Sequence, residues 1–209
     1  MNKIVIAGAG AHCKVILDIL GSCGGYELVG LLDSGDRTEL LGVPVIGTDR
    51  MLRELYSAGV RYGFAAIGNN QVREKVSAGM EEAGFTLVSL VSPHAVVSPY
   101  AQIGAGTAVM PGAVINACAK IGRGCVINTN CSVDHDCDIG DFVHIAPGCA
   151  VSGSTRVGHG SFLGTGARVI DRITIGAQVM VGAGAAVIRD LPDGCTAVGV
   201  PARMIKKEG

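Results

Sequence analysis

The sequence predicts a small α/β unit over residues 1–90 followed by a parallel β-helix over residues 91–192. Three observations support this fold class. Strand-like and helix-like segments alternate up to residue 90. From Val91 onward, an aliphatic residue recurs at every sixth position. The 209 residues include 32 Gly and no Trp, a composition that suits many tight corners around a narrow core.

The first 90 residues show the pattern of a parallel sheet covered by helices. Strands are expected over 3–7, 27–32, 62–67 and 86–90, and helices over 12–20, 48–58 and 71–83. This alternation favours parallel strands joined by right-handed crossovers, in a Rossmann-like unit. Gly8 and Gly10 follow the first strand and suggest a phosphate-binding turn at a helix N-terminus. Cys13 replaces the third glycine of the dinucleotide fingerprint, so the motif supports NAD binding only weakly.

The repeats begin at Val91 and have a period of six. All seventeen positions from 91 to 187 in steps of six are Val, Ile or Leu, and the fifth place of most hexads is small. Gly follows the aliphatic residue every eighteen residues, at 104, 122, 140, 158 and 176. Three hexads therefore make one triangular coil, with the aliphatic residue inside and Gly relieving the tight turn. Between five and six coils are expected, followed by a turn and a short basic tail over 193–209.

Charge and cysteine patterns exclude several classes of function. The formal net charge is −1 without a basic stripe, so neither a nucleic-acid partner nor a membrane-surface patch is expected. No apolar run reaches transmembrane length, and the N-terminal apolar run is too short for a signal peptide. The eight Cys include no C-x-x-C pair, which predicts free thiols in a reducing, cytoplasmic setting.

Several motifs carry a resemblance to a known family. They are Gly8-Ala9-Gly10-Ala11-His12, Leu31-Leu32-Asp33, Ala66-Ile67-Gly68-Asn69-Asn70, Ile115-Asn116-Ala117, Ile127-Asn128-Thr129, Val133-Asp134-His135-Asp136-Cys137, His144 and Gly199-Val200-Pro201-Ala202. The repeats resemble the hexapeptide-repeat acyltransferases. Over nearly its full length the chain resembles the bacterial nucleotide-sugar N-acetyltransferases of the bacillosamine and GDP-perosamine pathways, within the sialic-acid O-acetyltransferase-like superfamily. The resemblance implies a left-handed β-helix, a homotrimer, and acetyl-CoA in the groove between neighbouring helices.

His135 is the candidate general base. An amine that attacks a thioester must lose a proton, and a neutral imidazole has a pKa near working pH. Asp134 and Asp136 flank His135, and a carboxylate on one ring nitrogen would raise the basicity of the other. The family places an acid directly after the His, which implies Asp136 and requires a corner at His135. A solvated wall residue is the alternative. No metal is expected, although His135, Cys137 and His144 could be considered as a zinc site.

The resemblance also assigns residues to the acetyl-CoA groove. His144 is implied near the acetyl carbonyl, meeting His135 across subunits, with a structural interface His as the alternative. Backbone amides of exposed coil edges can bind pantetheine and the thioester oxygen. The family pattern implies Thr165 for this role, and Ala183 where the family often has Gly. Apart from the resemblance, Arg203 near the C-terminus is a candidate phosphate contact, with a solvated terminal Arg as the alternative.

The sugar nucleotide is implied to bind the N-terminal unit. The implied contacts are Gly10, Ala11 and His12 near the sugar nucleotide, Asp33 and Ser34 near the base or ribose, and Gly68 and Asn69 closing the pocket. The family often has two acids where Asp33 and Ser34 stand, so the choice between a UDP and a GDP sugar stays open. Ordinary turn chemistry is the alternative for each of these positions.

The leading functional hypothesis is an acetyl-CoA-dependent acetyltransferase acting in bacterial surface glycan synthesis. Its acceptor would be the 4-amino group of an NDP-linked 4-amino-4,6-dideoxyhexose. The second hypothesis is O-acetylation of a sialic-acid-like sugar by the same fold. The third is a non-catalytic trimeric scaffold that binds a nucleotide sugar. The repeats do not distinguish among the three, because the acceptor depends on the N-terminal unit.

Overall fold

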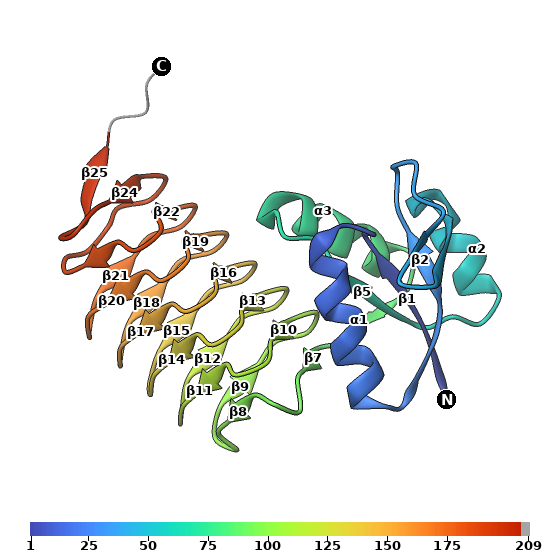
Figure 1. Cartoon of the computed structure of the whole chain (residues 1–209), viewed down its shortest axis with the longest axis horizontal. Helices are drawn as coiled ribbons and strands as arrows, with labels where there is room; N and C mark the ends of the chain where they lie inside the picture. The colour runs from blue at the N-terminus through green and yellow to red at the C-terminus, as the bar shows by residue number, and fades with distance from the viewer. Residues whose placement is uncertain (206–209) are drawn as a thin grey trace.

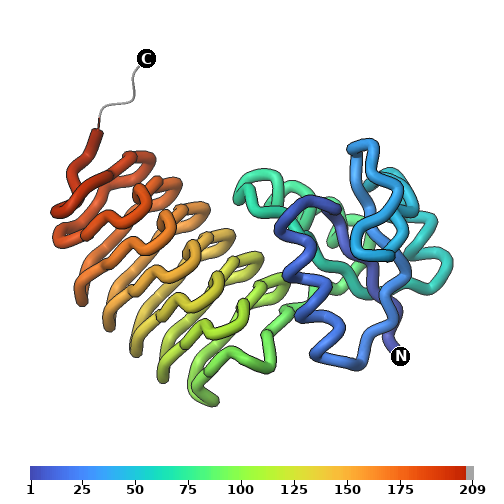
Figure 2. Tube along the Cα trace, viewed as in Figure 1, coloured from blue at the N-terminus to red at the C-terminus, as the bar shows by residue number. Residues whose placement is uncertain are grey.

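The computed structural model describes residues 1–205 of the chain. An α/β unit lies beside the first coils of a long β-helix, whose axis runs along the molecule (Figure 1). The trace in Figure 2 shows the coils stacked in sequence order, from green beside the α/β unit to red at the far end. No helix within the described residues is long and apolar enough to cross a membrane.

The α/β unit contains one six-stranded sheet in the order β3-β4-β2-β1-β5-β6. Its strands are β1 (Asn2–Ala7), β2 (Tyr26–Leu32), β3 (Glu39–Leu40), β4 (Val43–Gly47), β5 (Tyr62–Ala65) and β6 (Thr86–Leu87). Its helices are α1 (Ala11–Cys23), the 3-10 turn η1 (Asp49–Met51), α2 (Leu52–Ser57) and α3 (Asn70–Glu82). All neighbours pair in parallel except β3 and β4, the hairpin that the sequence pattern did not predict.

The hexads build three walls of parallel two-residue strands, and the first wall is extended by two three-residue strands, the last of which pairs antiparallel. The first wall consists of β7 (Leu90–Val91), β10 (Ala108–Val109), β13 (Val126–Ile127), β16 (His144–Ile145), β19 (Phe162–Leu163), β22 (Met180–Val181), β24 (Thr196–Val198) and β25 (Arg203–Ile205). The second wall consists of β8 (Val96–Val97), β11 (Val114–Ile115), β14 (Ser132–Val133), β17 (Ala150–Val151), β20 (Arg168–Val169) and β23 (Ala186–Val187). The third wall consists of β9 (Gln102–Ile103), β12 (Lys120–Ile121), β15 (Asp138–Ile139), β18 (Arg156–Val157) and β21 (Thr174–Ile175).

The aliphatic residue of each hexad fills the interior, as predicted. Ile127 pairs with Val109 of the coil before and Ile145 of the coil after, and all three are fully buried. The small residue of the fifth place packs beside them, as the buried Cys125 and Cys131 show. Burial of this continuous apolar column stabilises the stack, because no single coil encloses a core of its own.

The glycines that recur every eighteen residues do not relieve the turns, so that expectation was wrong. A Cβ on Gly104 would lie 2.6 Å from the carbonyl carbon of Gly122, and one on Gly158 would lie 2.5 Å from that of Gly176. These glycines therefore allow neighbouring coils to approach closely. The left-handed backbone of the corners occurs at other positions, including the non-glycine Asp136 (φ 58°).

The boundaries between the parts differ in detail from the sequence pattern. The expected strand over 86–90 is split, because β6 joins the α/β sheet and β7 opens the first wall. Residues 193–205, expected as a turn and tail, instead continue the first wall through β24 and β25. The end of that tail, 206–209, lies outside the described residues.

The α/β unit docks along the β-helix through two helices. Ile16 and Ile19 of α1 share a buried cluster with Ala108 and Val126, on the outer side of the first wall. Helix α3 lies against the corner that joins the third wall to the first, which we term the third corner. The first and second corners join the first wall to the second and the second to the third.

Candidate functional site

His135 and Asp136 form the turn at the second corner. His135 Nδ1 lies 2.8 Å from Asp136 Oδ2, and about 60% of each side chain is exposed. The left-handed backbone of Asp136 (φ 58°) lets the two adjacent residues share the corner. The corner that the sequence interpretation required at His135 is therefore present.

Asp134 has a different role from Asp136. Its Oδ1 accepts hydrogen bonds from Asn116 Nδ2 and from the backbone N–H of His135, each at 2.8 Å. The Asn116 bond is the main reason that the pKa of Asp134 is lowered. Asp134 thus fixes the backbone of the corner, whereas Asp136 is the carboxylate that contacts the imidazole ring.

The surroundings of the His135 ring are those expected of the predicted general base. The hydrogen bond to Asp136, followed by the charge of Asp134, raises the pKa of His135 above its usual value. When the neutral ring donates its Nδ1–H to Asp136, the lone pair of Nε2 is left free. Gly153, one coil further on, lies beneath this ring, and a Cβ there would be 2.8 Å from Nε2. Sequence reasoning missed Gly153, although its spacing of eighteen residues from His135 was available as a signal.

Replacement of Asp136 by Asn tests this arrangement. We expect Asp136→Asn to lower kcat/KM at least about tenfold, because the amide can donate to Nδ1 and favour the tautomer that lacks a free Nε2. Removal of the carboxylate also lowers the pKa of His135. A base acts only when unprotonated, so the acidic limb of the kcat/KM profile should shift to lower pH. An unshifted limb in a pH–rate profile would contradict the role of Asp136.

His144 lies on the outer side of the first wall and faces the α/β unit. Its Nδ1 is 3.3 Å from the carbonyl oxygen of Gly68, and its Nε2 is 3.1 Å from Asn128 Nδ2. Asn128 Oδ1 accepts from the backbone N–H of Thr129, which fixes the amide so that Nδ2 points to His144. His144 therefore donates from Nδ1 and accepts at Nε2. In this arrangement both ring nitrogens of His144 already have protein partners. The predicted contact of His144 with the acetyl carbonyl of acetyl-CoA stays a prediction.

Burial keeps His144 and its neighbour His12 uncharged. Desolvation, with a smaller contribution from the charge of Arg73, lowers the pKa of each to about 4. The two ring centroids are 6.4 Å apart, and the buried His12 Nε2 has no hydrogen-bond partner among residues 1–205. Within this part of the chain, His135 and His144 do not meet, since one is at the second corner and the other on the first wall.

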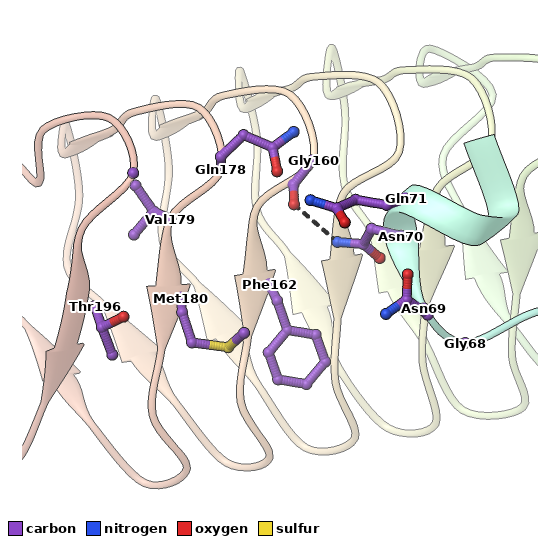
Figure 3. Close-up of a pocket in the computed structure, with 11 residues that line it drawn as sticks. Gly68, Asn69, Asn70, Gln71, Gly160, Phe162, Gln178, Val179, Met180 and Thr196 are labelled. Carbon is purple, nitrogen blue, oxygen red and sulfur yellow. Dashed lines mark hydrogen bonds between the residues drawn. The ribbon is translucent and has the colours of Figure 1, made fainter. Parts of the chain in front are cut away.

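Two cavities flank the start of α3. One, of about 490 Å³, lies between the loop before α3 and the outer side of the first wall (Figure 3). It contains the predicted Gly68 and Asn69, with Phe162 and Met180 on the opposite side. Asn70 Nδ2 closes one end through a 2.9 Å hydrogen bond to the carbonyl oxygen of Gly160.

The second cavity, of about 550 Å³, lies at the carboxyl ends of β1 and β2, where ligands bind parallel α/β sheets. The predicted Asp33 and Ser34 line it. Asp33 Oδ2 accepts the backbone N–H of Ala9 at 2.7 Å and so holds the glycine turn against β2. Gly10 caps α1 and Ala11 begins it, which places both predicted residues at the helix N-terminus.

The remaining predicted residues lie at the C-terminal half of the β-helix. Thr165 and Ala183 occupy the first corner one coil apart, where the N–H of Gly184 donates to Thr165 O at 2.8 Å. The N–H groups of Thr165 and Ala183 themselves have no acceptor in the described part of the chain. Arg203 is exposed in β25, and within residues 1–205 its side chain makes a single hydrogen bond, to the carbonyl oxygen of Ala202. No cluster of three potential metal ligands occurs within residues 1–205.

Comparison with known proteins gives full-length relatives. The model of the PglD N-terminal domain matches residues 3–80. A histidine variant of perosamine N-acetyltransferase from Caulobacter crescentus, solved with CoA and GDP-perosamine, is 43% identical with a TM-score of 0.96, and the match covers 99% of this chain and 98% of that one. This chain belongs to the nucleotide-sugar N-acetyltransferase family. The family resemblance of the sequence motifs is thereby confirmed.

Other members of the family agree. The acetyltransferase domain of PglB from Neisseria gonorrhoeae FA1090 is 40% identical with a TM-score of 0.91, over 98% of this chain and 100% of that one. UDP-N-acetylbacillosamine N-acetyltransferase from Bacillus subtilis (strain 168) is 40% identical over 116 residues, so the match spans about half of that relative (52%). These likenesses confirm the predicted fold class, a Rossmann-like unit followed by a left-handed parallel β-helix.

Proposed function

We propose that this nucleotide-sugar N-acetyltransferase transfers the acetyl group of acetyl-CoA to the 4-amino group of an NDP-linked 4-amino-4,6-dideoxyhexose in bacterial surface glycan synthesis. The observation that carries the proposal is the exposed His135 ring, which is bonded at Nδ1 to Asp136 and has no partner at Nε2 among residues 1–205. This pair occurs in a chain whose full-length relative was solved with CoA and GDP-perosamine. N-acetylation is therefore favoured over the sialic-acid and scaffold hypotheses.

His135 supplies the proton chemistry in this proposal. Its Nε2 accepts a proton from the sugar amine as the amine nitrogen forms a bond to the thioester carbonyl carbon. The carbon–sulfur bond then breaks, and the imidazolium returns the proton to the departing thiolate. Asp136 stabilises the charged ring throughout, and its hydrogen bond keeps Nε2 directed away from the corner.

Both substrates have binding surfaces of suitable chemistry. The free N–H groups of Thr165 and Ala183 offer donors to pantetheine along the first corner. Arg203, exposed near the end of the first wall, would contact a phosphate of coenzyme A. The glycine turn at the N-terminus of α1, held by Asp33, suits a diphosphate. His12, Ser34, Gly68 and Asn69 would complete the contacts to the sugar nucleotide.

A homotrimer is the proposed assembly, and the outward residues of the walls support it. Those of the second wall are mostly small or apolar: Val96, Val114, Ser132, Ala150, Arg168 and Ala186. Those of the third wall are all polar: Gln102, Lys120, Asp138, Arg156 and Thr174. The second wall therefore suits burial against another copy, while the third wall suits solvent. A neighbour would bring its second corner, with His135, to the cavity beside Phe162.

A cytoplasmic location is proposed for the same enzyme. Acetyl-CoA is a cytoplasmic metabolite, and the eight cysteines are all free thiols, which suits a reducing compartment. The buried cysteines serve as small core residues, since burial raises the pKa of Cys125 and Cys131 to about 12 and keeps them protonated.

The proposal is tested by incubating the protein with acetyl-CoA and each of three acceptors: a UDP-4-amino-4,6-dideoxy sugar, a GDP-4-amino-4,6-dideoxy sugar and free sialic acid. We expect thiol release and a mass gain of one acetyl group with at least one amino sugar, and the better amino sugar identifies the nucleotide. Turnover of sialic acid alone would favour O-acetylation. Binding of a sugar nucleotide without any turnover would favour the scaffold.

A further inference from the structure

Arg73 is a buried cation at the junction of the two parts of the chain. It lies on the first turn of α3, and only 1% of its surface is exposed. The side chain reaches from α3 to the third corner of the β-helix. Burial of an arginine is costly unless its donors are satisfied, so its partners indicate what it does.

All five N–H donors of the Arg73 guanidinium are used. Its partners are Gly124 O (2.6 Å), Ile67 O (3.0 Å), Gly68 O (3.2 Å), Asn70 Oδ1 (2.8 Å) and Phe142 O (3.2 Å). None of these acceptors is a carboxylate. Burial lowers the pKa of Arg73 to about 10, so the group stays charged at neutral pH. A planar fork with five donors can hold five oxygens at once, whereas a lysine has three donors at one point.

The Gly68 carbonyl links Arg73 to His144. It accepts from Arg73 Nη1 and also from His144 Nδ1. Asn128 donates to Nε2 of the His144 ring, so the ring proton must lie on Nδ1. The Gly68 carbonyl is the acceptor for that proton. Gly68 and Asn70 also line the cavity against the first wall. Arg73 thus contacts the segment that shapes one side of this cavity.

We propose that Arg73 is a positioning residue that holds the 67–70 loop in the conformation that binds the sugar nucleotide. It holds the carbonyls of Ile67 and Gly68 and the side chain of Asn70 in place, and through Gly68 it fixes the tautomer of His144. Arg73 itself touches no substrate in this role. The inference rests on the proposed function for its kinetic readout, but its structural readout is independent of turnover.

The test compares Arg73→Lys and Arg73→Met with Glu81→Gln. Glu81 lies on the same helix, about three turns after the 67–70 loop, and pairs with Arg123 at the same corner. The measurements are the melting temperature, the KM for the sugar nucleotide, kcat, and the ¹⁵N chemical shifts of the His144 ring, which distinguish the two tautomers. In Arg73→Lys we expect KM to rise about tenfold with a smaller change in kcat, and His144 to lose its single tautomer.

Several outcomes separate the possibilities. A lower melting temperature in Arg73→Lys, with wild-type KM and wild-type ¹⁵N shifts, would make Arg73 merely structural and overturn the proposal. The same rise in KM in Glu81→Gln would overturn it too, because loosening of α3 alone would then suffice. If Arg73→Met does not fold, Arg73→Lys carries the test. If the wild-type protein turns over no amino sugar, the proposed function fails, while the ¹⁵N comparison still decides the role of Arg73.

Discussion

His135→Ala should lower kcat/KM by about 10²- to 10⁴-fold, the usual contribution of a general base. In the proposed mechanism, the lone pair of the neutral imidazole takes the proton of the attacking amine. Because the side chain is more than half exposed and its partner is the adjacent Asp136, its removal leaves no buried group unpaired. We therefore expect the melting temperature to stay within about 1 °C of wild type, as for most exposed substitutions. Steady-state thiol release and a thermal scan measure the two effects.

His94→Ala is the matched control for this variant. His94 is also an exposed histidine in a corner turn, but it lies at the first corner of the first coil. Its replacement should leave kcat/KM unchanged. A His135→Ala enzyme that retains wild-type activity would remove His135 from the mechanism and return the scaffold hypothesis to consideration.

The second large effect is recovery of activity from two inactive variants. His135→Ala lacks the base, and Gly68→Phe fills the cavity beside the first wall, where a Cβ on Gly68 meets no atom within 4 Å. If the protein is the proposed homotrimer and each site combines His135 of one subunit with the cavity of another, co-expressed chains form mixed trimers with some intact sites. Random mixing gives about a quarter of wild-type activity, since each intact site needs two independent choices of subunit.

The control for complementation is co-expression of His135→Ala with His135→Gln. Both chains lack the same group, so no arrangement of subunits restores a site. Absence of recovery in the first pair, with mixed trimers confirmed by mass spectrometry, would place the whole site within one chain. That result would contradict the shared site but leave the chemistry of His135 intact.

The repeating part of the fold was predictable because each coil repeats the same packing problem. Each hexad places one aliphatic residue inside, as Val109, Ile127 and Ile145 show, and this produces a period of six in the sequence. His135 was recognisable because an imidazole flanked by two acids is typical of a general base. The choice of Asp136 depended on the family resemblance, and the hexad period did not show that His135 lies at a corner. The pattern did not distinguish close approach of neighbouring coils at the eighteen-residue glycines from relief of the turns, because both roles favour glycine.

The docking of the α/β unit was not predictable in the same way. Arg73 was missed because four of its five acceptors are backbone carbonyls, which carry no signature in the sequence. His144 was singled out by resemblance, yet its hydrogen bond to Gly68 joins residues 76 positions apart. Such contacts depend on how the α/β unit docks on the β-helix. Neither the periodicity of the sequence nor local propensity predicts that docking.

Helix α3 also has a mechanical consequence for the β-helix. Its side chains contact three successive coils at the third corner. Glu81 pairs with Arg123, Arg73 donates to Phe142 O, and Asn70 donates to Gly160 O. These contacts should make the three coils open together, whereas within residues 1–205 no hydrogen bond or ion pair joins α3 to the coils beyond Gln178. Unfolding of the β-helix should therefore start at its C-terminal coils and proceed coil by coil toward those that contact α3. The central coils around His135 and His144 should open last.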